Sequence, residues 1–80
     1  MDTIAQRLIT CFQTVFPDLS ETAIPHASQD SVAKWDSTAA IMLVNVVEDE
    51  FGIEMDLDRL AELDSFSRIH EYLTRELHAA

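Results

Sequence analysis

The sequence is short of glycine, proline and cysteine, and each shortage excludes a class of protein. One Gly and two Pro among 80 residues provide too few turns for a β-sandwich or barrel of many strands. The single cysteine, Cys11, has no partner for an internal disulfide, and no Cys/His cluster has the spacing of a zinc site. We therefore expect an all-α protein of a reducing compartment, without a metal site, in which Cys11 is a small buried hydrophobe.

Basic residues are scarce as well. Fifteen Asp and Glu outnumber five Lys and Arg, which gives a net charge of -10 at neutral pH. A chain this acidic is repelled by nucleic-acid phosphates and by anionic lipid surfaces, so we expect neither as a partner. The charge instead favours docking onto basic surfaces of other proteins.

Long apolar runs are missing. The longest, from Ala39 to Val47, is interrupted by Asn45 and is too short to cross a bilayer. The segment from Met1 to Ala5 contains no basic stretch followed by the apolar run of a secretory signal. We expect a cytoplasmic protein that does not bind membranes and that acts as a monomer.

Apolar residues recur at three- and four-residue steps in four segments, which predicts four helices. These helices are expected from about Thr3 to Phe16, from Ser37 to Phe51, from Asp56 or Leu57 to Leu63, and from Asp64 or Ser65 to about Leu77. A long connection from Pro17 to Asp36 is expected to be tied to the core by its few apolar residues, which are Leu19, Ile24, Val32 and Trp35. We predict one domain over residues 1–80, a small four-helix bundle of three longer helices and a short third one, with a long loop between the first and second.

The second predicted helix has clear ends and two distinct faces. Asp36 and Ser37 are both residues that cap helix N-termini, and Gly52 stands where a left-handed residue ends a helix. At about 100° per residue, one arc forms a complete core stripe. This stripe consists of Ala40, Leu43, Val44, Val47 and Phe51. The opposite arc consists of Thr38, Ile41, Met42, Asn45, Glu48 and Asp49.

Ile41 and Met42 are unexpected on an arc that should face solvent. They either cover the long loop, or are scattered surface apolar residues, or belong to a mixed apolar and acidic docking face for a partner. Ser37 is open to two interpretations as well. Free backbone N–H groups and the helix dipole would stabilise a phosphate ester on its hydroxyl, but a serine at a helix start is often only a cap.

The stretch around Ser37, WDSTAAIMLVNVVEDEFGI, closely resembles the acyl carrier protein family. Asp36 and Ser37 match the Asp-Ser motif at which that family is modified. The run EDEFGI, residues 48–53, matches the acidic and Phe-Gly end of the family's second helix at the usual distance. The resemblance continues through IEMDLDRLAELDSFSRIHEYL, so that it covers residues 32–77.

The resemblance implies a definite chemistry for Ser37. A phosphopantetheinyl transferase would attach 4′-phosphopantetheine from coenzyme A to its oxygen, and the terminal thiol would carry acyl groups as thioesters. Asp36 would belong to the contact surface and the metal environment at the transferase. The chain would not be an enzyme, but would present its cargo to acyl-loading and acyl-processing enzymes with basic docking surfaces, in fatty-acid, polyketide or another acyl-transfer pathway. Glu48 and Asp49 match acidic positions that meet Arg and Lys of partners, and we expect the partner surface to comprise Thr38, Ile41, Met42, Asn45, Glu48 and Asp49.

Three residues depart from the family pattern. Thr38 stands where Leu or Met is usual, Met42 where Glu is frequent, and Trp35 where many carriers have a small residue. Trp-Asp-Ser variants resemble carriers of dedicated or secondary pathways, and Trp35 would either anchor the loop to the core or stack on the prosthetic arm. Two alternatives stay open, an unmodified acidic helical interaction module and a D-alanyl or aminoacyl carrier.

Overall fold

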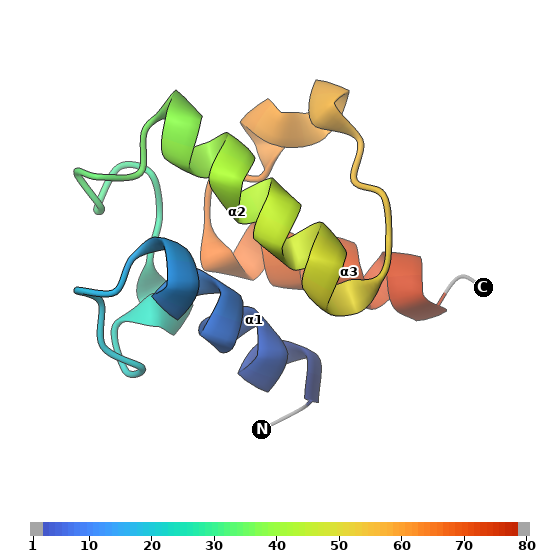
Figure 1. Cartoon of the computed structure of the whole chain (residues 1–80), viewed down its shortest axis with the longest axis horizontal. Helices are drawn as coiled ribbons and strands as arrows, with labels where there is room; N and C mark the ends of the chain where they lie inside the picture. Colours follow the sequence, from blue (N-terminus) through green and yellow to red (C-terminus); the bar gives the residue numbers. More distant parts are fainter. Residues whose placement is uncertain (1–2, 79–80) are drawn as a thin grey trace.

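The computed structural model describes residues 3–78, and this part of the chain folds into three α-helices and two short 3₁₀-helices without a named strand (Figure 1). The elements in chain order are α1 (Thr3–Val15), η1 (Ile24–His26), α2 (Ser37–Phe51), η2 (Leu57–Glu62) and α3 (Phe66–His78). None of the helices described has the length and apolar character needed to cross a lipid bilayer.

The prediction of a four-helix bundle is wrong, because the expected third helix is not an α-helix. The chain instead forms the six-residue 3₁₀-helix η2, and the protein is an all-α, three-helix fold. The Asp56 side chain accepts a hydrogen bond from the Asp58 N–H at 2.9 Å, and the Leu63 N–H donates three residues back to the Leu60 carbonyl at 3.1 Å. Apolar residues at strict three-residue steps fit a 3₁₀-helix, which has three residues per turn, better than an α-helix with 3.6.

The ends of the three α-helices agree with the sequence signals. α2 has the predicted bounds, with Asp36 at its N-cap and Gly52 in the left-handed conformation at φ 65°. α1 ends at Val15, one residue before the predicted end. α3 begins directly after Ser65, whose hydroxyl accepts a hydrogen bond from the Arg68 N–H at 3.2 Å.

The connection between α1 and α2 is held in place by apolar contacts along its length and by backbone hydrogen bonds from its middle. The predicted tie to the core is confirmed, because Ile24 and Trp35 are buried and the other two apolar residues pack partly against the core. The middle of the connection is held to the start of α3, where the Phe66 N–H donates to the Ala27 carbonyl at 3.0 Å and the Gln29 N–H donates to the Asp64 carbonyl at 2.9 Å.

The core is organised around the aromatic ring of Phe12. This ring lies 5.3 Å from the Trp35 ring in an edge-to-face arrangement, 5.4 Å from Phe66 and 6.1 Å from Phe16, measured between ring centroids. Phe12 therefore joins α1 to the long connection and to α3. The predicted core stripe of α2 is confirmed, since all five of its residues are buried.

Cys11 is buried beside Phe12, as the sequence predicts. Burial is the main reason that the pKa of its thiol is raised to about 11, and the nearby Glu50 carboxylate adds to the increase. The thiol is therefore protonated at neutral pH, and a protonated thiol is a poor nucleophile.

Most of the few basic side chains are paired with acids of the same chain. Arg7 illustrates this, because its Nε donates to the Glu50 carboxylate at 2.7 Å while its guanidinium lies 4.4 Å from the Phe51 ring centroid. This contact fastens α1 to the C-terminal turn of α2. Within residues 3–78, three further basic side chains form ion pairs, namely Lys34–Asp18 at 2.7 Å, Arg59–Glu62 at 3.7 Å and Arg68–Asp64 at 3.5 Å.

We predict that Phe12→Ala lowers the free energy of unfolding by about 3–5 kcal/mol, because it removes a fully buried ring and leaves a cavity. Urea denaturation followed by circular dichroism measures this loss. Thr14→Ala, at an exposed position on the same helix, is the control and should stay within about 0.5 kcal/mol of the parent. Equal costs for the two variants would contradict the central place of Phe12.

Candidate functional site

Asp36 caps α2 and so sets where the helix starts. Its backbone is extended, at φ -97° and ψ -172°, and its side-chain Oδ1 accepts a hydrogen bond from the Ala39 N–H at 2.9 Å. The Asp36 carbonyl accepts the first helical hydrogen bond, from the Ala40 N–H, also at 2.9 Å. Of the two residues that the sequence offers as caps, the structure uses Asp36.

Ser37 is consequently left without a capping role. It is the first residue of α2, its side chain is exposed, and its hydroxyl makes no hydrogen bond with any residue that the structure describes. The interpretation of Ser37 as only a cap is therefore wrong. A free hydroxyl at this position is accessible to a modifying enzyme, and the positive end of the helix dipole would stabilise a negative group attached to it.

The arc of α2 opposite the core forms an exposed face that leads away from Ser37. Ile41 is 48% exposed and Met42 is 52% exposed, so neither covers the long connection. Among the residues described, these two are the large hydrophobic side chains that are exposed to solvent. Thr38, Asn45 and Asp49 are exposed beside them. We call these five residues the α2 face.

Glu48 is the residue of the predicted partner surface that lies apart from the α2 face. Its side chain is half-buried, and its Oε2 accepts a hydrogen bond from the Met55 N–H at 2.7 Å. The Glu48 carbonyl also accepts from the Gly52 N–H at 2.8 Å. Glu48 thus fastens the segment after α2 to the helix end, and one of its carboxylate oxygens is already engaged by a backbone donor.

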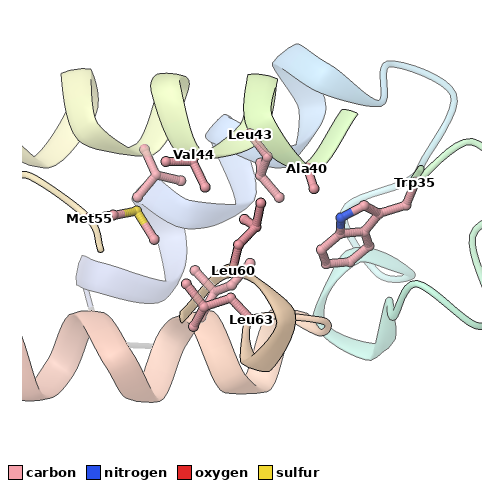
Figure 2. A pocket seen from close by; sticks show the side chains of 9 residues that line it. Trp35, Ala40, Leu43, Val44, Met55, Leu60 and Leu63 are labelled. Atoms are coloured by element: carbon pink, nitrogen blue, oxygen red, sulfur yellow. The ribbon is translucent and has the colours of Figure 1, made fainter. Parts of the chain in front are cut away.

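A small apolar pocket lies under the start of α2 (Figure 2). Its volume is about 10 Å³, and its lining comes from the long connection, from the core stripe of α2, from η2 with its flanking segments and from α3. The lining residues are Trp35, Ala40, Leu43, Val44, Val47, Met55, Leu60, Leu63 and Ile69. The sequence predicts that most of these residues are buried, but no local signal shows that they surround a pocket.

Trp35 is the lining residue nearest in sequence to Ser37. Its ring is 3% exposed and packs against Phe12 and Phe16, with 5.7 Å between the Trp35 and Phe16 centroids. Trp35 is therefore an anchor of the connection, which is one of its two predicted roles. A ring that is buried in this way cannot stack on a group outside the domain.

The acidic side chains show no arrangement for metal binding. Within residues 3–78, no group of three or more His, Cys, Asp or Glu side chains is placed to hold a metal ion.

Comparison with models of protein families, with curated proteins and with solved structures gives no match for this chain. Ser37, the α2 face and the pocket are the features of the structure that bear on its function.

We predict that the two neighbouring residues at the helix start differ in what they contribute to stability. Asp36→Ala removes the cap of α2 and should lower the free energy of unfolding by about 1 kcal/mol. Ser37→Ala removes a hydroxyl without a hydrogen bond and should change it by no more than about 0.5 kcal/mol. Thermal and urea unfolding of both variants measures the difference. A cost of Ser37→Ala as large as that of Asp36→Ala would mean that the serine caps the helix in solution.

Proposed function

We propose that this chain is an acyl carrier protein that holds its cargo on a 4′-phosphopantetheine arm attached to Ser37. The observation that carries the proposal is the serine itself. Its exposed hydroxyl is released from capping by Asp36 and stands at the start of a helix with an exposed apolar and acidic face. The resemblance of Asp36-Ser37 and of the acidic helix end to the acyl carrier protein pattern indicates which group would be attached to this hydroxyl.

The residues around Ser37 suit a phosphodiester. In the loading reaction the Ser37 oxygen attacks the phosphorus of coenzyme A that bears the pantetheine, a new O–P bond forms, and adenosine 3′,5′-bisphosphate leaves. The hydroxyl proton passes to a base of the transferase or to solvent. The first turn of α2 keeps backbone N–H groups and the positive end of its dipole beside the resulting negative charge. When attached, the arm supplies a thiol that carries acyl groups as thioesters.

The α2 face is the surface that partner enzymes would read. Ile41 and Met42 offer exposed apolar area within about one helical turn of Ser37, and Asp49 adds a negative charge further along. The net charge of -10 steers the chain toward basic surfaces and raises the rate of encounter. Tethering the cargo to a docked carrier then raises its local concentration at the partner's active site.

The chain itself makes and breaks no bond of the cargo in this proposal. Its buried thiol, Cys11, is protonated at neutral pH and lies inside the core. The arm thiol is the group to which the cargo would be attached. An aminoacyl cargo would use the same serine and the same arm, whereas an unmodified interaction module would use the α2 face without either.

We predict that co-expression with a promiscuous phosphopantetheinyl transferase adds the mass of the phosphopantetheine group to the intact chain, and that Ser37→Ala abolishes this increase. Intact-protein mass spectrometry measures both. Ser67→Ala is the matched control, because it removes an exposed serine hydroxyl near the start of α3, outside the α2 face, and should leave the modification unchanged. An unmodified parent would favour the interaction module, and a modified Ser37→Ala variant would place the arm on another residue.

We further predict that Met42→Glu separates partner recognition from folding. The side chain is about half exposed, so the free energy of unfolding should stay within about 0.5 kcal/mol of the parent. The loss of an exposed apolar contact near Ser37 should lower kcat/KM of the transferase by about five- to tenfold.

Ser67→Glu is the control for this variant, because it adds the same charge at an exposed position of α3 and should leave the loading rate unchanged. A much lower melting temperature of Met42→Glu would show that Met42 is packed in solution. Equal loading by both variants would remove Met42 from the recognition surface.

A further inference from the structure

The indole N–H of Trp35 is a buried hydrogen-bond donor without an acceptor. The Trp35 side chain is 3% exposed, and its Nε1 finds no hydrogen-bond partner among the residues described. Among the residues described, every other buried side-chain nitrogen or oxygen atom has a hydrogen-bond partner. Buried tryptophan N–H groups are usually paired, because an unpaired one has lost its hydrogen bond to water and gained nothing in return.

This donor is directed into the apolar pocket under the start of α2. Trp35 forms one end of the lining, and Figure 2 shows its nitrogen on the side of the ring that faces Ala40 and the rest of the pocket. The ring plane is held by Phe12, which meets it at 82°, and by Phe16, which meets it at 45°. With two aromatic neighbours in place, the ring cannot turn its nitrogen toward solvent without losing these contacts.

The pocket offers this donor nothing but apolar neighbours. Its other lining side chains are Ala, Val, Leu, Ile and Met, none of which carries a strong acceptor. Its volume of about 10 Å³ is close to the minimum for one water molecule, and a stable buried water needs two to four polar partners. An oxygen acceptor attached to an apolar body fits such a lining better than water does.

The pocket has a wall that can yield to a ligand. η2 is a six-residue 3₁₀-helix, and its backbone makes few close approaches to the three α-helices. Figure 1 shows it on the side of α2 opposite α1. Met55 and Leu60 line this side of the pocket; the methionine side chain adapts readily to a new neighbour, and Leu60 is already partly exposed. Outward movement of η2 would enlarge the pocket without disturbing Phe12.

We propose that the pocket selects short acyl groups that carry a ketone or hydroxyl oxygen beyond the thioester, and that this oxygen accepts a hydrogen bond from Trp35 Nε1. The inference rests on the proposed function, because it makes the cargo of the arm on Ser37 the ligand. A saturated acyl group of the same length would occupy the enlarged pocket but leave the N–H unpaired. A site that contains a buried polar group discriminates against ligands that cannot pair it.

The test compares two forms of the parent chain, loaded by the transferase with butyryl- or 3-oxobutyryl-phosphopantetheine. The chain has one tryptophan, so its NMR spectrum contains a single indole N–H resonance. We expect this resonance to move downfield in the 3-oxobutyryl form relative to the butyryl form, and its exchange with solvent deuterium to slow by about tenfold. Identical resonances and exchange rates in the two forms overturn the inference.

Two variants connect the effect to the indole nitrogen. In the parent chain we expect the 3-oxobutyryl form to melt at a higher temperature than the butyryl form. Trp35→Phe keeps an aromatic ring but removes the donor, so this difference should disappear. Phe16→Leu is the control, because it disturbs the same aromatic cluster and keeps the donor; the difference between the two loaded forms should persist. A difference that persists in Trp35→Phe overturns the assignment to Trp35.

Failure of this inference is distinguishable from failure of the proposed function. Intact mass reports whether the arm and its acyl group are attached, independently of where the acyl group lies. A chain that gains the mass but shows no difference in the indole signal is a carrier without this selectivity. A chain that gains no mass overturns both proposals. Should Trp35→Phe fail to fold, the indole resonance of the parent still decides the question.

Discussion

The edge-to-face contact between Phe12 and Trp35 is the interaction on which the candidate site depends. Its centroids lie 5.3 Å apart, and such aromatic pairs contribute about 0.5–1.5 kcal/mol beyond the area that they bury. Trp35 directly precedes the cap residue Asp36, and the exposed residue Ser37 follows as the first residue of α2. The long connection could otherwise deliver the chain to α2 in many conformations. Fixing one ring in the core therefore fixes the point at which the helix starts and the direction in which its first side chains point.

The sequence predicts α2 well because its signals are local. An Asp before the first turn, a glycine after the last one and a regular apolar period are each read within a few residues, and the structure has the same bounds and the same buried stripe. The segment at 57–62 is different. Its apolar residues recur every three positions, which is compatible with both kinds of helix over so short a length, and the Asp56 side chain favours a tight turn at its start. A four-helix bundle was consequently the wrong prediction for this chain.

The candidate site depends on details that a linear pattern does not contain. Asp36 and Ser37 are equally good capping residues by type, and only the extended backbone of Asp36 decides which of them caps. Glu48 belongs to the outer arc by periodicity, yet it turns toward the Met55 N–H because the chain reverses direction after Gly52. The pocket gathers side chains from residues 35 to 69, so it arises from tertiary packing alone. The unpaired nitrogen of Trp35 likewise results from tertiary packing and has no local sequence signal.

The excess of acidic over basic residues determines the electrostatic force between separate copies of the chain. Within residues 3–78, four basic side chains form ion pairs with carboxylates of the same molecule, namely Arg7, Lys34, Arg59 and Arg68. Much of the positive charge is therefore already paired within the molecule. In colloidal terms each molecule is a small polyanion whose repulsion of its own kind extends over a Debye length, about 8 Å at physiological ionic strength. At a net charge of -10 this repulsion opposes the close approach of two copies, and added salt weakens it by shortening the Debye length.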